Sequence, residues 1–375
     1  MRKMAAFLVS AIIIISLSAC QKPPSQMDYD DLNNKTRQVY PSDNYISIDT
    51  KEETASVLAS VPKHLDETLQ NGAFILSISA DVITFDVREV YNISIETVSP
   101  NPEAALNVCF SENDMAKVVL VDGQYRIPPV DTSGNVLMDA GLQWRDDGFF
   151  DFNDYRIDSK KAVPLVETLV GKHITVPEAI EKGHELLSAL GLEGAYFSEA
   201  SSFCVQNEPQ TVYHYLRFVP IYEGLPIIFD RFMTDSRPMG SITLGDEGLL
   251  SVNGRFMFEQ SEKKPIQRVL SFDSILENIR QQLDKQNPLA PVPVTRIALC
   301  YYPQGYNAES NAAPSVSNAQ NSIAAQSTIG YDLQPVWCFY ADTQDAAYTD
   351  ALKDAGYRVG VICVDAVTGN VIEWP

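Results

Sequence analysis

The stretch Thr175-Val176-Pro177-Glu178 begins the most regular pattern in the chain. Thr175 and Glu178 have the spacing of a helix capping box, and apolar residues then recur at 176, 179, 180, 186, 187 and 190 before a stop at Gly191. This spacing predicts an amphipathic helix with one buried face. Strand-like runs follow it, at 211–219, 226–230 and 241–244. Together these elements predict a helix packed on an antiparallel sheet.

A second pattern of the same kind begins at Ser271-Phe272-Asp273-Ser274. Apolar residues at 272, 275, 276, 279 and 283 define its helical face, and strand-like runs follow at 295–302, 335–341 and 358–364. Each pattern ends in a glycine-containing turn and a last strand. We therefore expect two related units, 171–262 and 265–375, and an α+β fold class. An accidental similarity between two generic units is the alternative.

Residues 51–165 predict a further α+β domain that precedes these units. A short helix is expected from Asn101-Pro102 to about Phe110, because Asn caps helices and Pro suits the first helical position. A strand at 117–121 is followed by the turn pair Asp122-Gly123. Alternating apolar residues indicate half-buried strands at 73–80, 82–87 and 91–96.

Residues 1–20 have the layout of an export signal. Arg2 and Lys3 precede a nearly continuous apolar run at 4–16, which is too short for a membrane span of roughly 20 apolar residues. The closing Leu17-Ser18-Ala19-Cys20 resembles the lipobox of bacterial lipoproteins. That resemblance implies a signal peptide at 1–19 and lipid attachment at Cys20. An ordinary secretory signal and an uncleaved anchor are the alternatives.

Two segments lack the apolar content needed for packing. Residues 20–50 are polar and predict a flexible tether between the lipid and the folded part. Residues 303–330 include a stretch rich in Ala, Ser and Asn, which predicts a mobile loop.

The chain is acidic, with 49 Asp and Glu against 28 Lys and Arg and a formal charge of −21. Nucleic acid is excluded as an expected partner, because binding it requires a concentrated basic surface. We interpret the dispersed acidity as a source of solubility, with an acidic binding face as the alternative.

Five cysteines follow the predicted lipidation site, and none has the CxxC spacing of a redox or zinc site. Several lie in apolar strand-like runs, which favours buried thiols that act as small hydrophobic side chains. A structural disulfide is the alternative in an exported protein, and the redox state stays open. These cysteines are Cys109, Cys204, Cys300, Cys338 and Cys363.

Known catalytic motifs are incomplete in this sequence. His184-Glu185-Leu186-Leu187-Ser188 lacks the second histidine of the zinc-protease motif HExxH. Ser261-Glu262-Lys263-Lys264 matches the Ser-x-x-Lys motif without its partner motifs. Asp151-Phe152-Asn153-Asp154-Tyr155-Arg156 starts like a calcium loop but lacks the required glycine and distal glutamate. We therefore predict no catalytic residue, no metal site and no cofactor.

Two short motifs carry a family resemblance. The corner Tyr222-Glu223-Gly224-Leu225-Pro226-Ile227 and the ending Asp365-Ala366-Val367-Thr368-Gly369 resemble those of PepSY-like domains. The overall plan is similar to uncharacterised lipoproteins of clostridial bacteria and, more distantly, to extracytoplasmic regulators of a cell-wall sensor kinase. The resemblance implies tandem PepSY-like units, each a helix on an antiparallel sheet. Its motifs are structural, so it implies no catalytic residue.

These features predict a non-enzymatic, extracytoplasmic lipoprotein, anchored to the bacterial cell membrane through Cys20, that binds or regulates an envelope protein partner. The first alternative is a solute-, peptide- or glycan-binding lipoprotein that uses aromatic residues such as Trp144, Tyr222, Trp337 and Trp374. The second is an envelope hydrolase, favoured only where a structure brings acidic residues and a histidine together in a cleft. The sequence leaves the partner, any small-molecule ligand and the oligomeric state open.

Overall fold

The capping box at Thr175 forms as the sequence predicts. The Thr175 hydroxyl accepts from the Glu178 amide, and the Glu178 carboxylate accepts from the Thr175 amide, at the start of α6 (Val176–Ala189). The buried face of α6 includes Ala179 and Leu187, which pack among strand residues. Gly183 lies on this face, where an added Cβ would be 2.8 Å from the Phe197 ring, so glycine allows close helix packing.

The structure is a computed structural model. It describes residues 51–71, 74–127, 140–154, 162–164, 173–192, 194–205, 208–228, 238–246, 248–282, 292–308, 328–341 and 361–373. Most residues of the described part lie in strands, and about a fifth lie in helices. Besides α6, its helices are α3 (Thr54–Ser60), α4 (Pro102–Cys109), α5 (Glu112–Met115) and α7 (Phe272–Gln282).

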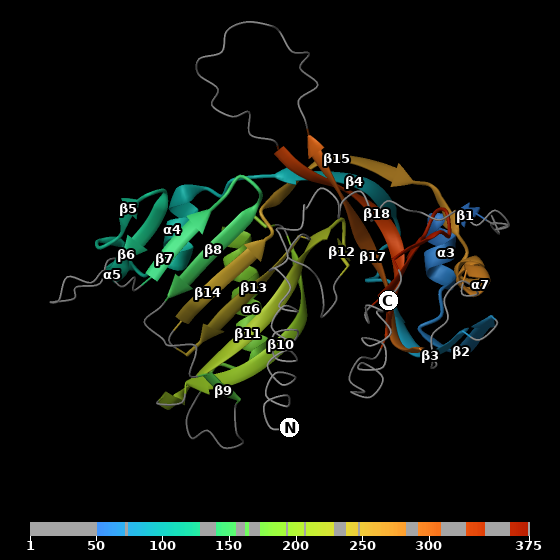
Figure 1. The fold of residues 1–375 in the computed structure, drawn as a ribbon, viewed down its shortest axis with the longest axis horizontal. Helices are drawn as coiled ribbons and strands as arrows, with labels where there is room; N and C mark the ends of the chain where they lie inside the picture. Colours follow the sequence, from blue (N-terminus) through green and yellow to red (C-terminus); the bar gives the residue numbers. More distant parts are fainter. Residues whose placement is uncertain are drawn as a thin grey trace, which may run out of the picture. The chain divides into compact units, whose positions relative to one another are not determined.

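A ten-stranded antiparallel sheet holds the first set of described strands (Figure 1). Its strands, in spatial order, are β5 (Val119–Val121), β6 (Gln124–Ile127), β7 (Ala140–Trp144), β8 (Phe149–Asp154), β14 (Gly248–Arg255), β13 (Met239–Gly245), β11 (Glu208–Tyr222), β10 (Ala195–Val205) and β9 (Ala162–Pro164). The short β12 (Leu225–Pro226) pairs with β11 beside this path. Helices α4 and α6 contribute to the core of this sheet.

A second large sheet has eight strands. A separate two-stranded sheet pairs β1 (Lys51–Glu53) with β16 (Arg268–Leu270). The eight-stranded sheet has the order β15 (Phe258–Ile266), β4 (Val90–Thr97), β18 (Thr328–Ala341), β17 (Val292–Ala308), β3 (Phe74–Ile83) and β2 (His64–Asn71). Beside this path, β19 (Val361–Asp365) pairs with β18, and β20 (Val371–Glu373) pairs with β19. Helices α3 and α7 contribute to its core.

The predicted α+β fold with tandem PepSY-like units is wrong. The described part of the chain is mostly β-sheet, and neither large sheet is built from one predicted unit. From the N-terminal segment, β8 pairs with β14, whereas β3 lies parallel to β17, so Figure 1 shows blue and orange strands adjacent in the eight-stranded sheet. Local periodicity identifies strands but leaves their partners open, because pairing is set by long-range burial and register.

Other local predictions have mixed outcomes. Asn101 caps α4, and the Asp122-Gly123 turn joins β5 to β6, as expected. The predicted loop 303–330 overlaps strand residues at both ends, because β17 continues to Ala308 and β18 begins at Thr328. Its middle, like the predicted signal peptide and tether, lies outside the described residues. No helix in the described ranges is long and apolar enough to cross a membrane.

We expect Ile275→Ala to lower the free energy of unfolding by about 2–5 kcal/mol, because Ile275 is fully buried where α7 meets the eight-stranded sheet. Urea denaturation followed by circular dichroism measures the change. Asp273→Ala is the matched control on the exposed face of the same helix and should cost at most about 1 kcal/mol. Equal losses in the two variants would contradict the assigned packing of α7.

Candidate functional site

The structure brings together histidine and acidic residues that the sequence had not linked. We call His173, Ser202, His214 and Asp246 the histidine cluster. One Asp246 carboxylate oxygen lies 2.7 Å from His173 Nδ1, and the carboxylate also accepts hydrogen bonds from the backbone amides of Ile174 and Val212. Asp246 therefore ties the segment before α6 to β11 at the end of β13.

His214 in this cluster is buried and has a hydrogen-bond partner at each ring nitrogen. Its Nε2 lies 2.7 Å from the Ile174 carbonyl oxygen and its Nδ1 lies 2.8 Å from the Ser202 hydroxyl. A carbonyl oxygen only accepts, so Nε2 carries a proton. This is the arrangement of a histidine that holds backbone in place.

The Asp246 carboxyl group has a pKa below its usual range. Burial is the largest single influence on this pKa and raises it, but the hydrogen bonds from His173 and from the two backbone amides together outweigh burial. The carboxylate is thus the form that the fold stabilises.

The histidine cluster gives the hydrolase alternative little support. The Ser202 hydroxyl bonds to His214, whose other nitrogen bonds to a backbone carbonyl rather than to a carboxylate. His173 Nε2 has no hydrogen-bond partner among the described residues, so no described nucleophile is oriented by it. The contacts favour a structural function for the cluster.

The other motif residues are also held in structural contacts. His184 is exposed on α6, with its ring edge-on to Phe197 at 4.8 Å between centroids. Within the described ranges, no group of three or more His, Cys, Asp or Glu side chains is placed to hold a metal ion. Tyr222 and Trp337 are buried in the core, and Cys20 and Trp374 lie outside the described residues.

The strand β5 presents a different kind of surface. Val119, Leu120 and Val121 are 43%, 61% and 41% exposed. Among the described strands, β5 lies at one edge of the ten-stranded sheet. We call these three residues the apolar edge. The turn that follows has positive φ at Asp122 (50°) and Gly123 (76°), as in the tight turns that join hairpin strands.

Three other described sheet edges, those of β15, β2 and β9, carry residues that discourage strand addition. Such edges are normally protected by charged side chains or proline, because an unpaired strand offers free N–H and C=O groups to another chain. On β15 these residues are Lys263, Lys264 and Pro265, and on β2 they include Asp66 and Glu67. The edge strand β9 ends in Pro164. The apolar edge is composed of Val and Leu alone.

An aromatic pair extends the apolar edge across the next two strands. Leu120 lies directly opposite Tyr125 on β6, so the two side chains share a face of the sheet. The Tyr125 ring stacks on Trp144 of β7, with 5.5 Å between centroids and 22° between planes. Both rings are half-buried. Leu120 thus continues a surface that is already apolar.

The sequence predicts the β5 strand but misses its exposure. A run of Val, Leu and Val suggests burial, and only the pairing order places the strand at an edge. The sequence itself therefore carries no signal for this exposure, because an apolar run without polar alternation is typical of a buried strand.

No family model matches the chain, and no curated protein matches it. A crystal structure of an uncharacterized protein from Eubacterium rectale ATCC 33656 aligns over 94% of this chain and 100% of its own, with a TM-score of 0.49 and 13% sequence identity.

We expect Asp246→Asn to lower the free energy of unfolding at pH 7 by about 1–3 kcal/mol, because two backbone amides and His173 lose a charged acceptor. The folded-state pKa of Asp246 is lowered, so its contribution is present above the unfolded value of about 3.9 and is lost as the pH falls through the folded value. Urea titrations at pH 7 and at several values below pH 4 should therefore show a smaller acid-induced loss in the variant. Glu185→Gln, on the exposed face of α6, is the control. An unchanged acid profile in Asp246→Asn would argue against the assigned contacts.

Proposed function

We propose that this protein is a non-enzymatic, extracytoplasmic lipoprotein that is held at the membrane through Cys20 and binds an envelope protein partner by strand addition at β5. The observation that carries the proposal is the apolar edge of Val119, Leu120 and Val121, which lacks the charged residues and proline found on the edge strands β15, β2 and β9. The lipobox resemblance supports the anchor.

Strand addition suits the geometry of β5. An extended partner segment would bond to the free backbone groups of the edge, and its alternate side chains would contact Leu120 on one face and Val119 and Val121 on the other. Each of these side chains is about half exposed, so covering one contributes on the order of 1 kcal/mol. The side chains therefore add modest affinity, and the backbone bonds fix the register.

Charge limits the kind of partner. With a formal charge of −21, the chain repels acidic segments and attracts neutral or basic ones. We therefore expect the partner segment to be a β-prone stretch with apolar residues and a neutral or basic flank.

The stacked Tyr125 and Trp144 rings favour a second candidate, a glycan-binding lipoprotein. Half-buried aromatic faces pack against the apolar face of sugars, and this pair lies on the strands next to β5. The two candidates differ in the residue they need most, which is Leu120 for strand addition and Trp144 for glycan binding.

We expect Leu120→Lys to abolish partner capture without a change in stability of more than about 0.5 kcal/mol, because Leu120 is the most exposed residue of the apolar edge. The assay is a pull-down from membranes, with a photoreactive amino acid at position 121 that reports which protein contacts the edge. Gln260→Lys, on the protected edge strand β15, is the matched control and should capture as much as the unmodified chain.

Strand addition at β5 would be ruled out if Leu120→Lys captured as much partner protein as the unmodified chain. It would also be ruled out if the cross-links from position 121 were unchanged by Leu120→Lys. Tight binding of a sugar that is lost in Trp144→Ala, with no protein recovered, would instead select the glycan-binding candidate.

We expect Cys20→Ala to release the protein from membranes, because the thiol that would carry the lipid is removed. Fractionation of cells into membrane and soluble material measures the effect. Ser18→Thr, which leaves the cysteine in place, is the control. A variant that stays in the membrane fraction would disprove lipid anchoring at this residue.

A further inference from the structure

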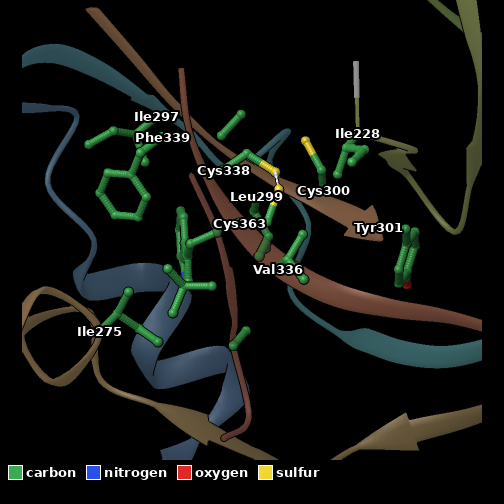
Figure 2. Close-up of a cluster of buried hydrophobic side chains, with 14 of the residues drawn as sticks. Ile228, Ile275, Ile297, Leu299, Cys300, Tyr301, Val336, Cys338, Phe339 and Cys363 are labelled. Carbon is green, nitrogen blue, oxygen red and sulfur yellow. Dashed lines mark hydrogen bonds between the residues drawn. The ribbon is translucent and has the colours of Figure 1, made fainter. Parts of the chain in front are cut away.

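The core of the eight-stranded sheet contains two thiols that face each other. Cys338 on β18 and Cys363 on β19 are both fully buried, with 3.8 Å between their sulfur atoms. Figure 2 shows the two sulfur atoms pointing toward one another between neighbouring strands.

The backbone register places this pair at a position suited to a disulfide. Cys338 and Cys363 are directly opposite in the antiparallel β18–β19 pair. Ala366 N donates to Pro335 O, so residues 335 and 366 form a hydrogen-bonded pair. Such pairs alternate with non-hydrogen-bonded ones, and three positions further along, Cys338 and Cys363 fall on a non-hydrogen-bonded pair. There the Cα atoms are about 4.5 Å apart, within the range of roughly 4.4–6.8 Å that disulfides span.

We propose that Cys338 and Cys363 form a disulfide in the exported protein, one that joins β19 covalently to β18. To form the bond, the two sulfur atoms must approach from 3.8 Å to about 2.05 Å. It rests on the extracytoplasmic location in the proposed function, but not on strand addition at β5, which involves neither residue.

Cys300 is the competing thiol and is less well placed. Across the β17–β18 pair, Ala298 lies opposite Cys338 and Cys300 lies opposite Val336. Cys300 is thus diagonal to Cys338, and diagonal Cα atoms are about 7–8 Å apart, beyond the usual disulfide range. Its sulfur lies 3.7 Å from the Tyr340 hydroxyl and also neighbours the Cys338 thiol, so the backbone register is what separates the two candidates.

The reaction is thiol–disulfide exchange with an external disulfide, either a small molecule or an oxidising protein. One cysteine thiolate attacks the external disulfide and expels one thiolate, which leaves a mixed disulfide. The second cysteine thiolate then attacks the sulfur of the first and expels the other thiolate. Two thiol protons are released, the two cysteines lose two electrons, and the external disulfide gains them.

Burial determines when this exchange can happen. Burial, and next the neighbouring thiols, raise the pKa of Cys338, so little thiolate exists in the folded state. The bond therefore closes during folding, before β18 and β19 are covered. Outside the membrane, oxidising surroundings supply the external disulfide.

The test uses the full chain with Cys20→Ala, which leaves five cysteines. The reduced protein is refolded with a mixture of reduced and oxidised glutathione, denatured without reductant and alkylated. Three of the five thiols should react, and peptide mapping should find 338 joined to 363. Once formed, the bond should raise the thermal midpoint by about 5–10 °C relative to the reduced protein.

Two further variants carry a second change beside Cys20→Ala. Cys363→Ala should show four reactive thiols, and its thermal midpoint should not depend on reductant. Cys204→Ser, the matched control, should show two reactive thiols, and its thermal midpoint should still depend on reductant. If Cys363→Ala does not fold, the alkylation count and peptide map of the Cys20→Ala chain decide alone. Five reactive thiols after refolding, or a peptide that joins 300 to 338, would overturn the proposal.

Discussion

The antiparallel register between β17 and β18 is the constraint on which the eight-stranded sheet depends. Fourteen residue pairs connect the two strands, from Val294 with Ala341 to Ala308 with Thr328. On their outer sides β17 pairs with β3, and β18 pairs with β4 and β19. A slip of one residue would turn every β18 side chain to the opposite face, including the buried Trp337 and Phe339. The positions of three further strands follow from this one alignment.

Local chemistry made some of this structure predictable. The capping box at Thr175, the Asn101 cap and the Asp122-Gly123 turn are interactions within a few residues, and the sequence predicts each correctly. The fold class was predicted wrongly because it depends on pairings between distant segments, such as Phe152 with Val252. Similar local patterns at 175 and 271 therefore suggested a repeat that the strand pairings do not contain.

For the candidate site too, the sequence predicted some properties and missed others. The acidic charge argued against nucleic acid, whereas the envelope protein partner was inferred from the lipobox, the apparent repeat and the incomplete catalytic motifs, and it stays a prediction. The exposure of Leu120 and the contact between His173 and Asp246 arise only when segments far apart in the chain meet. An exposed apolar strand at a sheet edge can pair with another chain, and this is the property on which the proposed strand addition depends.

The parallel pairing of β3 with β17 also bears on how the protein acquires its fold. Asp81 pairs with Arg296, which is 296 − 81 = 215 positions later, so the loop that must close is most of the folded chain. Contacts of such separation form slowly, and this one cannot form before β17 has been synthesised. During synthesis the eight-stranded sheet therefore stays incomplete until β17 has been made. The topology thus makes the completion of this sheet a late event, which follows the synthesis of most of the chain.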